Sequence, residues 1–157
     1  MVNDEELTQT LIDNRLLRNE EEITAFEQAI SSILDLKELN HIRSLCLGFH
    51  DATEYDEVMF GLIQAIESYD DFFDSEQSLN ELAGSLPYML PHANEWAKTL
   101  HKRILNHEPS FKEYKKVIST ADDKVKEMVL QVVNEIKERN PKRFEPSVDE
   151  FVLYVSN

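Results

Sequence analysis

The sequence predicts an all-α protein, and two observations carry this prediction. Apolar residues recur with a period near 3.6 along almost the whole chain, and no segment alternates with period two for long enough to form a central strand. Glycine is rare, with 3 residues in 157, so the chain is poorly suited to tight hairpins and to glycine-rich phosphate loops. We expect one helical domain over residues 1–157, because a chain of this length buries a core of its own.

Three helices are expected in the first third of the chain. Each places apolar residues three or four positions apart, as in an amphipathic helix. Asn19 and Glu22 have the spacing of an N-cap followed by an acidic residue in the first helical turn. The expected segments are residues 4–18, a helix opened by Asn19, and residues 36–47, which end at Gly48.

The stretch from Asp51 to Asp74 has the clearest amphipathic pattern. We expect Thr53 to cap a helix here, with Asp56 at the third position. The opposite faces of this helix differ in character, one being apolar and the other acidic. The predicted inward residues are Tyr55, Met59, Leu62, Ile66, Tyr69 and Phe73.

Prolines separate the remaining elements, because a proline in a helix interior removes a backbone hydrogen bond. Pro141 and Pro146 bracket a predicted loop, and Ser147 with Glu150 follows as a capping box. The apolar tail, residues 151–155, fits either a last helical turn or a short extended segment. The helices expected before this loop cover residues 79–86, 92–107, a short segment opened by Ser110 with Glu113 after Pro109, and 121–139.

These segments amount to about eight short helices joined by short loops, with neighbours in the chain packing as pairs. Two helix pairs of similar length, within residues 36–74 and 79–118, suit a HEAT-like stack. No exact repeat is visible in the sequence, so an irregular helical bundle stays open as the alternative.

The charge of the chain is strongly negative and unevenly placed. The formal net charge is -15, from 16 Lys and Arg against 31 Asp and Glu, which disfavours binding to nucleic acids or to anionic membranes. Residues 1–91 carry a net charge of -16, whereas residues 92–157 carry +1. The 54 residues between Arg43 and Lys98 hold 11 carboxylates and no Lys or Arg. Clustered carboxylates repel one another, so we consider a basic partner, with acidic solubility as the simpler explanation.

The acidic side of the 51–74 segment is our predicted partner-binding surface, and we call it the acidic face. Phe60 lies in the middle of it, where burial against the core would not place an aromatic ring. An aromatic ring among charged residues is typical of an interface anchor, although an isolated exposed ring or a contact with a neighbouring helix would also explain it. The acidic face comprises Asp56, Glu57, Phe60, Gln64, Glu67, Asp70, Asp71 and Asp74.

No motif for catalysis, metal binding or a cofactor is found, so we expect no catalytic residues, no metal and no cofactor. The stretch from Asp70 to Glu81 lacks the oxygen ligands and glycine of an EF-hand. Cys46 lies in an apolar run and is expected to be a buried small side chain. Trp96 is expected in the core, and the five histidines are expected at the surface or half-buried.

The N-terminal sequence MVNDEELTQT is acidic and polar, unlike a secretory signal or a transit peptide. No apolar run approaches the roughly 18 residues of a membrane span. We therefore expect a cytoplasmic protein.

Two segments resemble the immunity protein 30 family of bacterial polymorphic-toxin systems. They are GFHDATEYDEVMFGLIQAIESYDD and LPYMLPHANEWAKTLHKRILNH, and the resemblance covers about residues 45–110. The resemblance implies a small cytoplasmic protein that is encoded beside a toxin and blocks this toxin by direct binding. Toxins of contact-dependent growth inhibition are among those implied. The resemblance implies a nuclease as the typical toxin, and an acidic surface would complement its basic cleft.

Two other classes of function remain open at this stage. A helical adaptor that binds a basic cellular protein would show the same charge pattern and the same lack of catalytic motifs. A carboxylate-dependent metalloenzyme would need acidic side chains that are buried, because burial tunes the pKa of a catalytic acid. The acidic face lies on the polar side of its helix, which disfavours this class.

Overall fold

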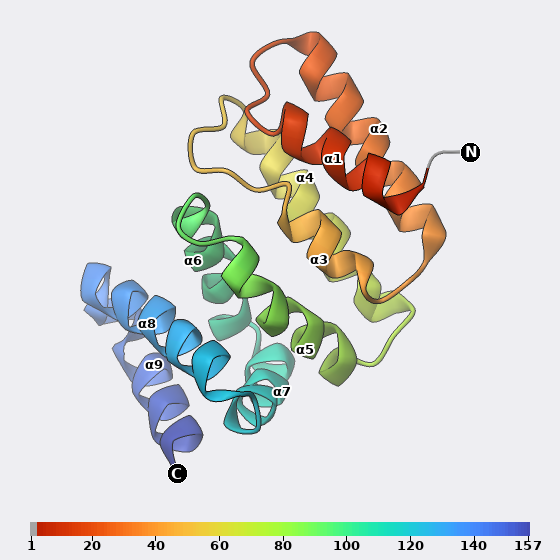
Figure 1. Cartoon of the computed structure of the whole chain (residues 1–157). Coiled ribbons are helices and arrows are strands. Elements are labelled where there is room, and N and C mark those ends of the chain that lie inside the picture. Colours follow the sequence, from red (N-terminus) through yellow and green to blue (C-terminus); the bar gives the residue numbers. More distant parts are fainter. Residues whose placement is uncertain (1–2) are drawn as a thin grey trace.

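The computed structural model describes residues 3–157, and these residues fold into nine α-helices and two short 3₁₀ segments without any strand, as predicted (Figure 1). The elements are α1 (Asp4–Asn14), α2 (Glu20–Leu36), α3 (His41–Cys46), α4 (Asp56–Glu67), η1 (Ser68–Asp71), α5 (Ser75–Ser85), η2 (Leu86–Tyr88), α6 (Asn94–Leu105), α7 (Glu108–Ser119), α8 (Asp123–Arg139) and α9 (Pro141–Ser156).

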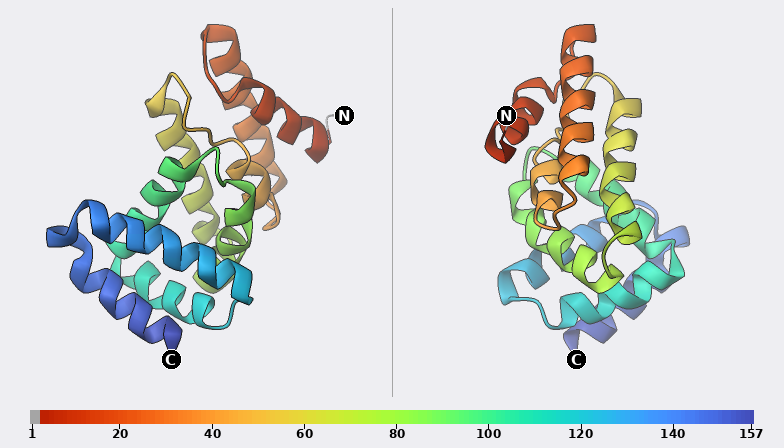
Figure 2. Two further views of the ribbon diagram at one scale, coloured as in Figure 1. Left: turned by 60° about the vertical axis from the view of Figure 1, so that its left-hand side comes forward. Right: turned by 90° about the vertical axis from the view of Figure 1, so that its right-hand side faces the viewer.

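Helices pack both against their neighbours in the chain and against helices two positions away. The neighbouring pairs include α1 with α2, α6 with α7, and α8 with α9. In addition, α3 packs against α5, α5 against α7, and α7 against α9, while α2 packs against α4 and α6 against α8. The chain thus progresses from α1 and α2 at one end of the molecule to α8 and α9 at the other (Figures 1 and 2).

The buried apolar side chains of all nine helices form one cluster. Trp96 belongs to it as predicted, with 7% of its surface exposed and its ring 6.1 Å from that of Phe49. Four of the predicted inward residues of the 51–74 segment are buried, and Phe73 is half-buried. The prediction for Tyr55 is wrong, since it is 49% exposed. It precedes the first turn of α4, so the helical period does not orient its side chain.

The first two helices begin as predicted but differ at their ends. Asn19 caps α2, its side-chain oxygen accepting a hydrogen bond from the backbone of Glu22 at 2.9 Å. The first helix ends at Asn14 rather than near residue 18, because Leu17 adopts a left-handed φ of 53° while its side chain is buried. Similarly, Lys37 has a φ of 50° and ends α2.

The segment expected over residues 36–47 is therefore shorter than predicted. Its first residue belongs to α2, and α3 covers only His41–Cys46. The predicted cap at Thr53 is also wrong, because α4 begins at Asp56 and Tyr55 occupies its N-cap position without a side-chain hydrogen bond. The expected short helix 79–86 begins four residues earlier, at Ser75.

The start of α7 differs from the predicted capping box as well. The N-cap is His107, whose Nδ1 accepts a hydrogen bond from the backbone N–H of Ser110 at 3.4 Å. Pro109 lies within the first turn, where a missing N–H breaks no helical hydrogen bond. The predicted cap residue Ser110 is thus already inside the helix.

The C-terminal segment contradicts the predicted loop between Pro141 and Pro146. Both prolines lie inside α9, which continues through residues 151–155 to Ser156. Four apolar side chains at helical spacing are buried by this continuation, which outweighs the cost of about 3 kcal/mol for an interior proline. These side chains are Phe144, Val148, Phe151 and Val155.

Candidate partner-binding surface

The structure exposes all eight residues of the acidic face. Five of them lie on α4, whose 12 residues extend over about 18 Å. Asp70 and Asp71 follow on η1, and Asp74 stands just before α5. The helical wheel therefore identified the solvent side of α4 correctly, but the helix predicted to reach Asp74 ends at Glu67, so the wheel does not explain the exposure of the last three residues.

Phe60 contacts a neighbouring helix and still presents part of its ring to solvent. Its ring lies edge-on to that of Trp96 on α6, with centroids 5.4 Å apart and planes at 80°. The residue is nevertheless 44% exposed. Aromatic pairs of this geometry stabilise the packing by roughly 0.5–1.5 kcal/mol. Phe60 is thus held in a defined position among the carboxylates of the acidic face.

One carboxylate of the acidic face is neutralised by a cation that the sequence pattern did not reveal. Arg103 of α6 donates two hydrogen bonds to the carboxylate of Glu67, both at 2.8 Å. The hydrogen bonds from Arg103 to Glu67 raise the pKa of the guanidinium further. Both side chains are more than 40% exposed, so solvent screening limits the contribution of this pair to stability to less than about 1 kcal/mol.

Asp70 differs from the other carboxylates of the face in the pKa of its carboxyl group, which is raised although the residue is exposed. Desolvation raises the pKa of this carboxyl group, the nearby Ser78 hydroxyl acts against it, and the charges of Asp71 and Glu67 raise the pKa further. Within residues 3–157, no Lys or Arg forms an ion pair with it. Asp70 and Glu67 also line a pocket of about 460 Å³ that extends between α5, α6 and the start of α7.

The two segments that resemble the immunity protein family are joined by direct contacts. The carboxylate of Asp51 accepts hydrogen bonds from the backbone N–H groups of Glu95 and Trp96, at 3.1 and 3.3 Å, and so caps α6. The backbone N–H of Asp51 donates to the carbonyl of His92 at 2.9 Å, and the rings of His50 and His92 lie 5.6 Å apart. These contacts hold the loop before α4 on the start of α6, so the two segments form one structural unit.

The buried nucleophilic and titratable groups act as packing residues. Cys46 is fully buried as predicted, and burial raises the pKa of its thiol to about 12, which keeps it protonated and unreactive. The expectation of surface or half-buried histidines is wrong for His41 and His101, each 2% exposed. His101 bonds the carbonyl of Ala97 at 2.7 Å and the hydroxyl of Tyr114 at 2.8 Å. Burial lowers its pKa to about 4, so a neutral imidazole links α6 to α7.

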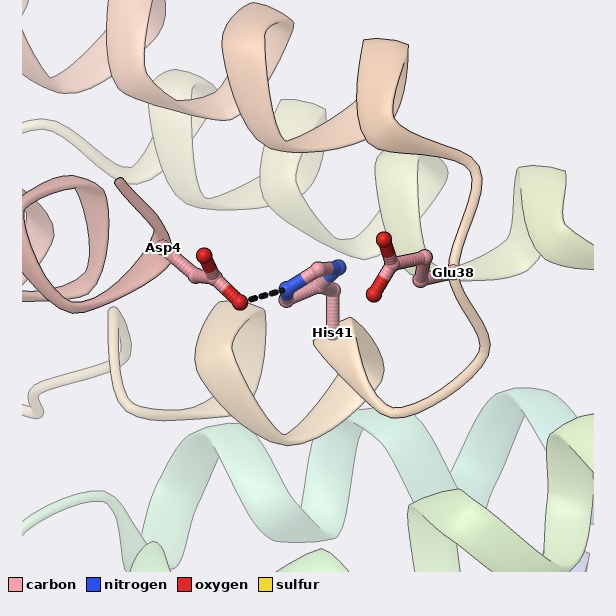
Figure 3. Close-up of side chains that lie close together, drawn as sticks. All are labelled: Asp4, Glu38 and His41. Carbon is pink, nitrogen blue, oxygen red and sulfur yellow. Dashed lines mark hydrogen bonds and ion pairs between the residues drawn. The ribbon is translucent and has the colours of Figure 1, made fainter. Parts of the chain in front are cut away.

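Three side chains from α1, α3 and the turn before α3 lie close enough to bind a metal ion. In the N-terminal cluster, as we name Asp4, Glu38 and His41, one ligand atom of each lies within 4.8 Å of the others. Nε2 of His41 lies 3.1 Å from Asp4, and this hydrogen bond lowers the pKa of the Asp4 carboxyl. Figure 3 shows the two carboxylates on opposite sides of the imidazole. The sequence analysis missed this cluster, although the Glu-x-x-His spacing of residues 38–41 is a known metal-ligand pattern.

None of the helices in the described part of the chain is both long and apolar enough to cross a membrane.

Two further features of the candidate site, Arg103 and the pocket beside Asp70, were not predicted from the sequence. No signal in the sequence pairs Arg103 with a carboxylate 36 positions away.

Comparison with known families gives one match. The sequence model of a family described as immunity protein 30 matches residues 13–114, which is more than half of the chain. No curated protein and no solved structure matches the chain. The matched range extends the resemblance at residues 45–110 in both directions and contains the whole acidic face, the cap that Asp51 places on α6, and the pocket beside Asp70.

Proposed function

The chain belongs to the immunity protein 30 family, and from this premise we propose that it neutralises a cognate toxin domain by binding it through the acidic face. The partner is a domain with a basic surface, and a nuclease is the toxin class that this charge fits best. Nucleases bind phosphates with clustered Lys and Arg side chains. A surface of carboxylates placed on such a cleft attracts the toxin and excludes its substrate. The protein acts by binding in the cytoplasm, without catalysis.

The observation that carries this proposal is the exposure of the acidic face within the family-matched range. Glu57, Asp71 and Asp74 form no ion pair within residues 3–157. These carboxylates are therefore available to pair with basic side chains of a partner. Electrostatic attraction of this kind acts mainly on the rate of association.

The surroundings of the acidic face favour a rigid binding surface. Phe60 is held against Trp96, and Asp51 fixes the start of α6 relative to α4. A side chain that is ordered before binding loses less conformational entropy in the complex. We also interpret the packing of α3, α5, α7 and α9 in succession as a HEAT-like stack, an architecture that presents residues of successive helices along one surface.

The test is co-purification with the product of the neighbouring toxin gene, followed by binding kinetics at low and high salt. We expect Glu57→Lys combined with Asp71→Lys to slow association and to weaken its dependence on salt. The matched control is Glu138→Lys with Glu145→Lys, which changes the net charge equally at exposed positions on α8 and α9 outside the family-matched range.

Two outcomes would contradict the proposal in different ways. Equal association rates for the test and control variants would show that the acidic face is only a solvated surface. Failure to bind the neighbouring gene product, together with capture of a basic cellular protein, would favour an adaptor without a toxin partner.

A further inference from the structure

The pocket beside the acidic face combines an apolar floor with a carboxylate at its mouth. Its volume is about 460 Å³, which is large enough for a long side chain of another protein. The floor consists of buried aliphatic side chains from four helices, which offer no hydrogen bonds to a bound group. They are Ile42, Ile66, Leu79, Leu82, Leu100 and Ile104.

Two polar groups of the pocket, the carboxylate of Asp70 and the hydroxyl of Ser78, lie near each other and have no cationic partner within residues 3–157. Glu67 is occupied by Arg103 through two hydrogen bonds, whereas Asp70 has no cationic partner among the described residues. Ser78 lines the same pocket and is 6% exposed. Its hydroxyl forms no hydrogen bond of good geometry within residues 3–157, but it lies near the carboxyl of Asp70 and lowers the pKa of that group. A buried hydroxyl without a partner costs free energy that a ligand can recover.

We propose that this pocket receives a lysine or arginine side chain of the bound partner. The aliphatic stem lies against the apolar floor, the cationic group pairs with Asp70, and one of its N–H groups donates to the hydroxyl of Ser78. This inference rests on the proposed function, because it names the chemistry with which the partner enters the surface.

The charges of the pocket select a cation over an apolar or an anionic side chain. An apolar group would bury the carboxylate of Asp70 further without compensating its charge, which is costly. An anion would be repelled by Asp70. Arg103 shows that a guanidinium can pair with a carboxylate at the mouth of the pocket, since it donates two hydrogen bonds of 2.8 Å to Glu67. His107 also lines the pocket, but its Nδ1 contacts Ser110 at 2.7 Å and serves as the cap of α7.

The free protein allows a direct test with three small probes. Butylguanidinium and butylammonium represent the two basic side chains, and butanol has the same stem without charge. We expect chemical shifts of the pocket methyl groups of Leu82 and Ile104 to respond to both cations at concentrations about tenfold lower than to butanol. Binding of a cation should also lower the pKa of Asp70, measured by titration of its carboxyl carbon. Equal binding of butanol, or shifts that avoid the pocket, would overturn the proposal.

Variants then separate this inference from the proposed function. Asp70→Asn should remove the preference for cations, whereas Asp71→Asn, an exposed neighbour that does not line the pocket, should leave it unchanged. Ser78→Ala should weaken binding of the cations while leaving butanol unaffected, and unfolding curves of each variant will show that it folds. In the complex, we expect Asp70→Asn to weaken toxin binding about tenfold. A toxin that binds the wild type and Asp70→Asn equally would refute the pocket inference and leave the proposed function intact.

Discussion

Replacing Phe60 with alanine separates the role of this ring in folding from its role in binding. In the free protein 44% of the residue is exposed. For a phenylalanine side chain of about 200 Å², roughly 90 Å² is then available to a partner. Burial of this area at about 25 cal/mol per Å² contributes about 2 kcal/mol. We therefore expect Phe60→Ala to raise the Kd for the toxin by roughly thirtyfold, mainly through a faster off-rate.

The same substitution also affects stability, which the sequence pattern alone did not indicate. The part of the ring that packs against Trp96 is lost, and we expect the free energy of unfolding to fall by about 1–3 kcal/mol. Urea denaturation measures this loss, and the fluorescence of Trp96, the one tryptophan of the chain, reports both unfolding and binding. Phe60→Leu is the control, since it keeps most of the apolar area. An unchanged off-rate for a folded Phe60→Ala protein would refute the anchor role.

Three further predictions concern ion pairs, pH and metals. Glu67→Lys should lower the free energy of unfolding by up to about 1 kcal/mol, because it loses the pair with Arg103 and places a like charge beside it. The charge swap Glu67→Arg with Arg103→Glu should restore stability, and urea denaturation of both variants measures the difference. Burial lowers the pKa of His101 from 6.5 to about 4, so below pH 6.5 the unfolded state binds more protons and stability should decrease as the pH falls, by up to about 3 kcal/mol near pH 4. Thermal unfolding across this range should show a weaker pH dependence in His101→Gln, and an equal dependence would contradict the assignment. We expect the unfolding midpoint to be the same with and without a chelator, and a large drop on chelation would indicate a metal in the N-terminal cluster.

The internal contacts of two acidic-face residues affect the choice of positions for mutagenesis. The position of the acidic face opposite the apolar stripe by itself predicts that charge reversal leaves folding unharmed. However, Glu67 holds Arg103 and Asp70 lines the pocket. Variants at these two positions change stability or pocket chemistry together with surface charge. Glu57 and Asp71 are the better positions for testing electrostatic attraction alone, because both are exposed and form no ion pair among the described residues.

The all-α fold class and the solvent side of the 51–74 segment could be predicted from the sequence, because both depend on residues within one or two helical turns. The helix predicted over residues 121–139 runs over Asp123–Arg139, with Asp122 as its cap. The N-cap at Asn19 is confirmed for the same reason, since a capping bond spans only three residues. The exposure of the five face residues on α4 follows from the 3.6-residue period, whereas Asp70, Asp71 and Asp74 are exposed beyond the end of this helix.

Local patterns failed where burial elsewhere in the molecule outweighed them. Pro146 and the pair Ser147 and Glu150 indicate a break and a new helix start, yet α9 runs through them because its apolar side chains pack against α7 and α8. Leu17 turns the chain in a left-handed conformation because its side chain is buried. In both cases tertiary packing supplies more free energy than the local preference costs.

The details of the candidate site were decided only by tertiary structure, because they join residues far apart in the chain. Arg103 reaches Glu67 across 36 positions, and Asp51 caps α6 across 44. The pocket beside Asp70 exists only because residues of α3, α4, α5, α6 and α7 converge there. Helical periodicity determines which side of a helix meets solvent, but it carries no information about which other helix lies beside it. The sequence therefore determined that an acidic face exists, and the packing of α6 against α4 determined which of its carboxylates are free to bind a partner.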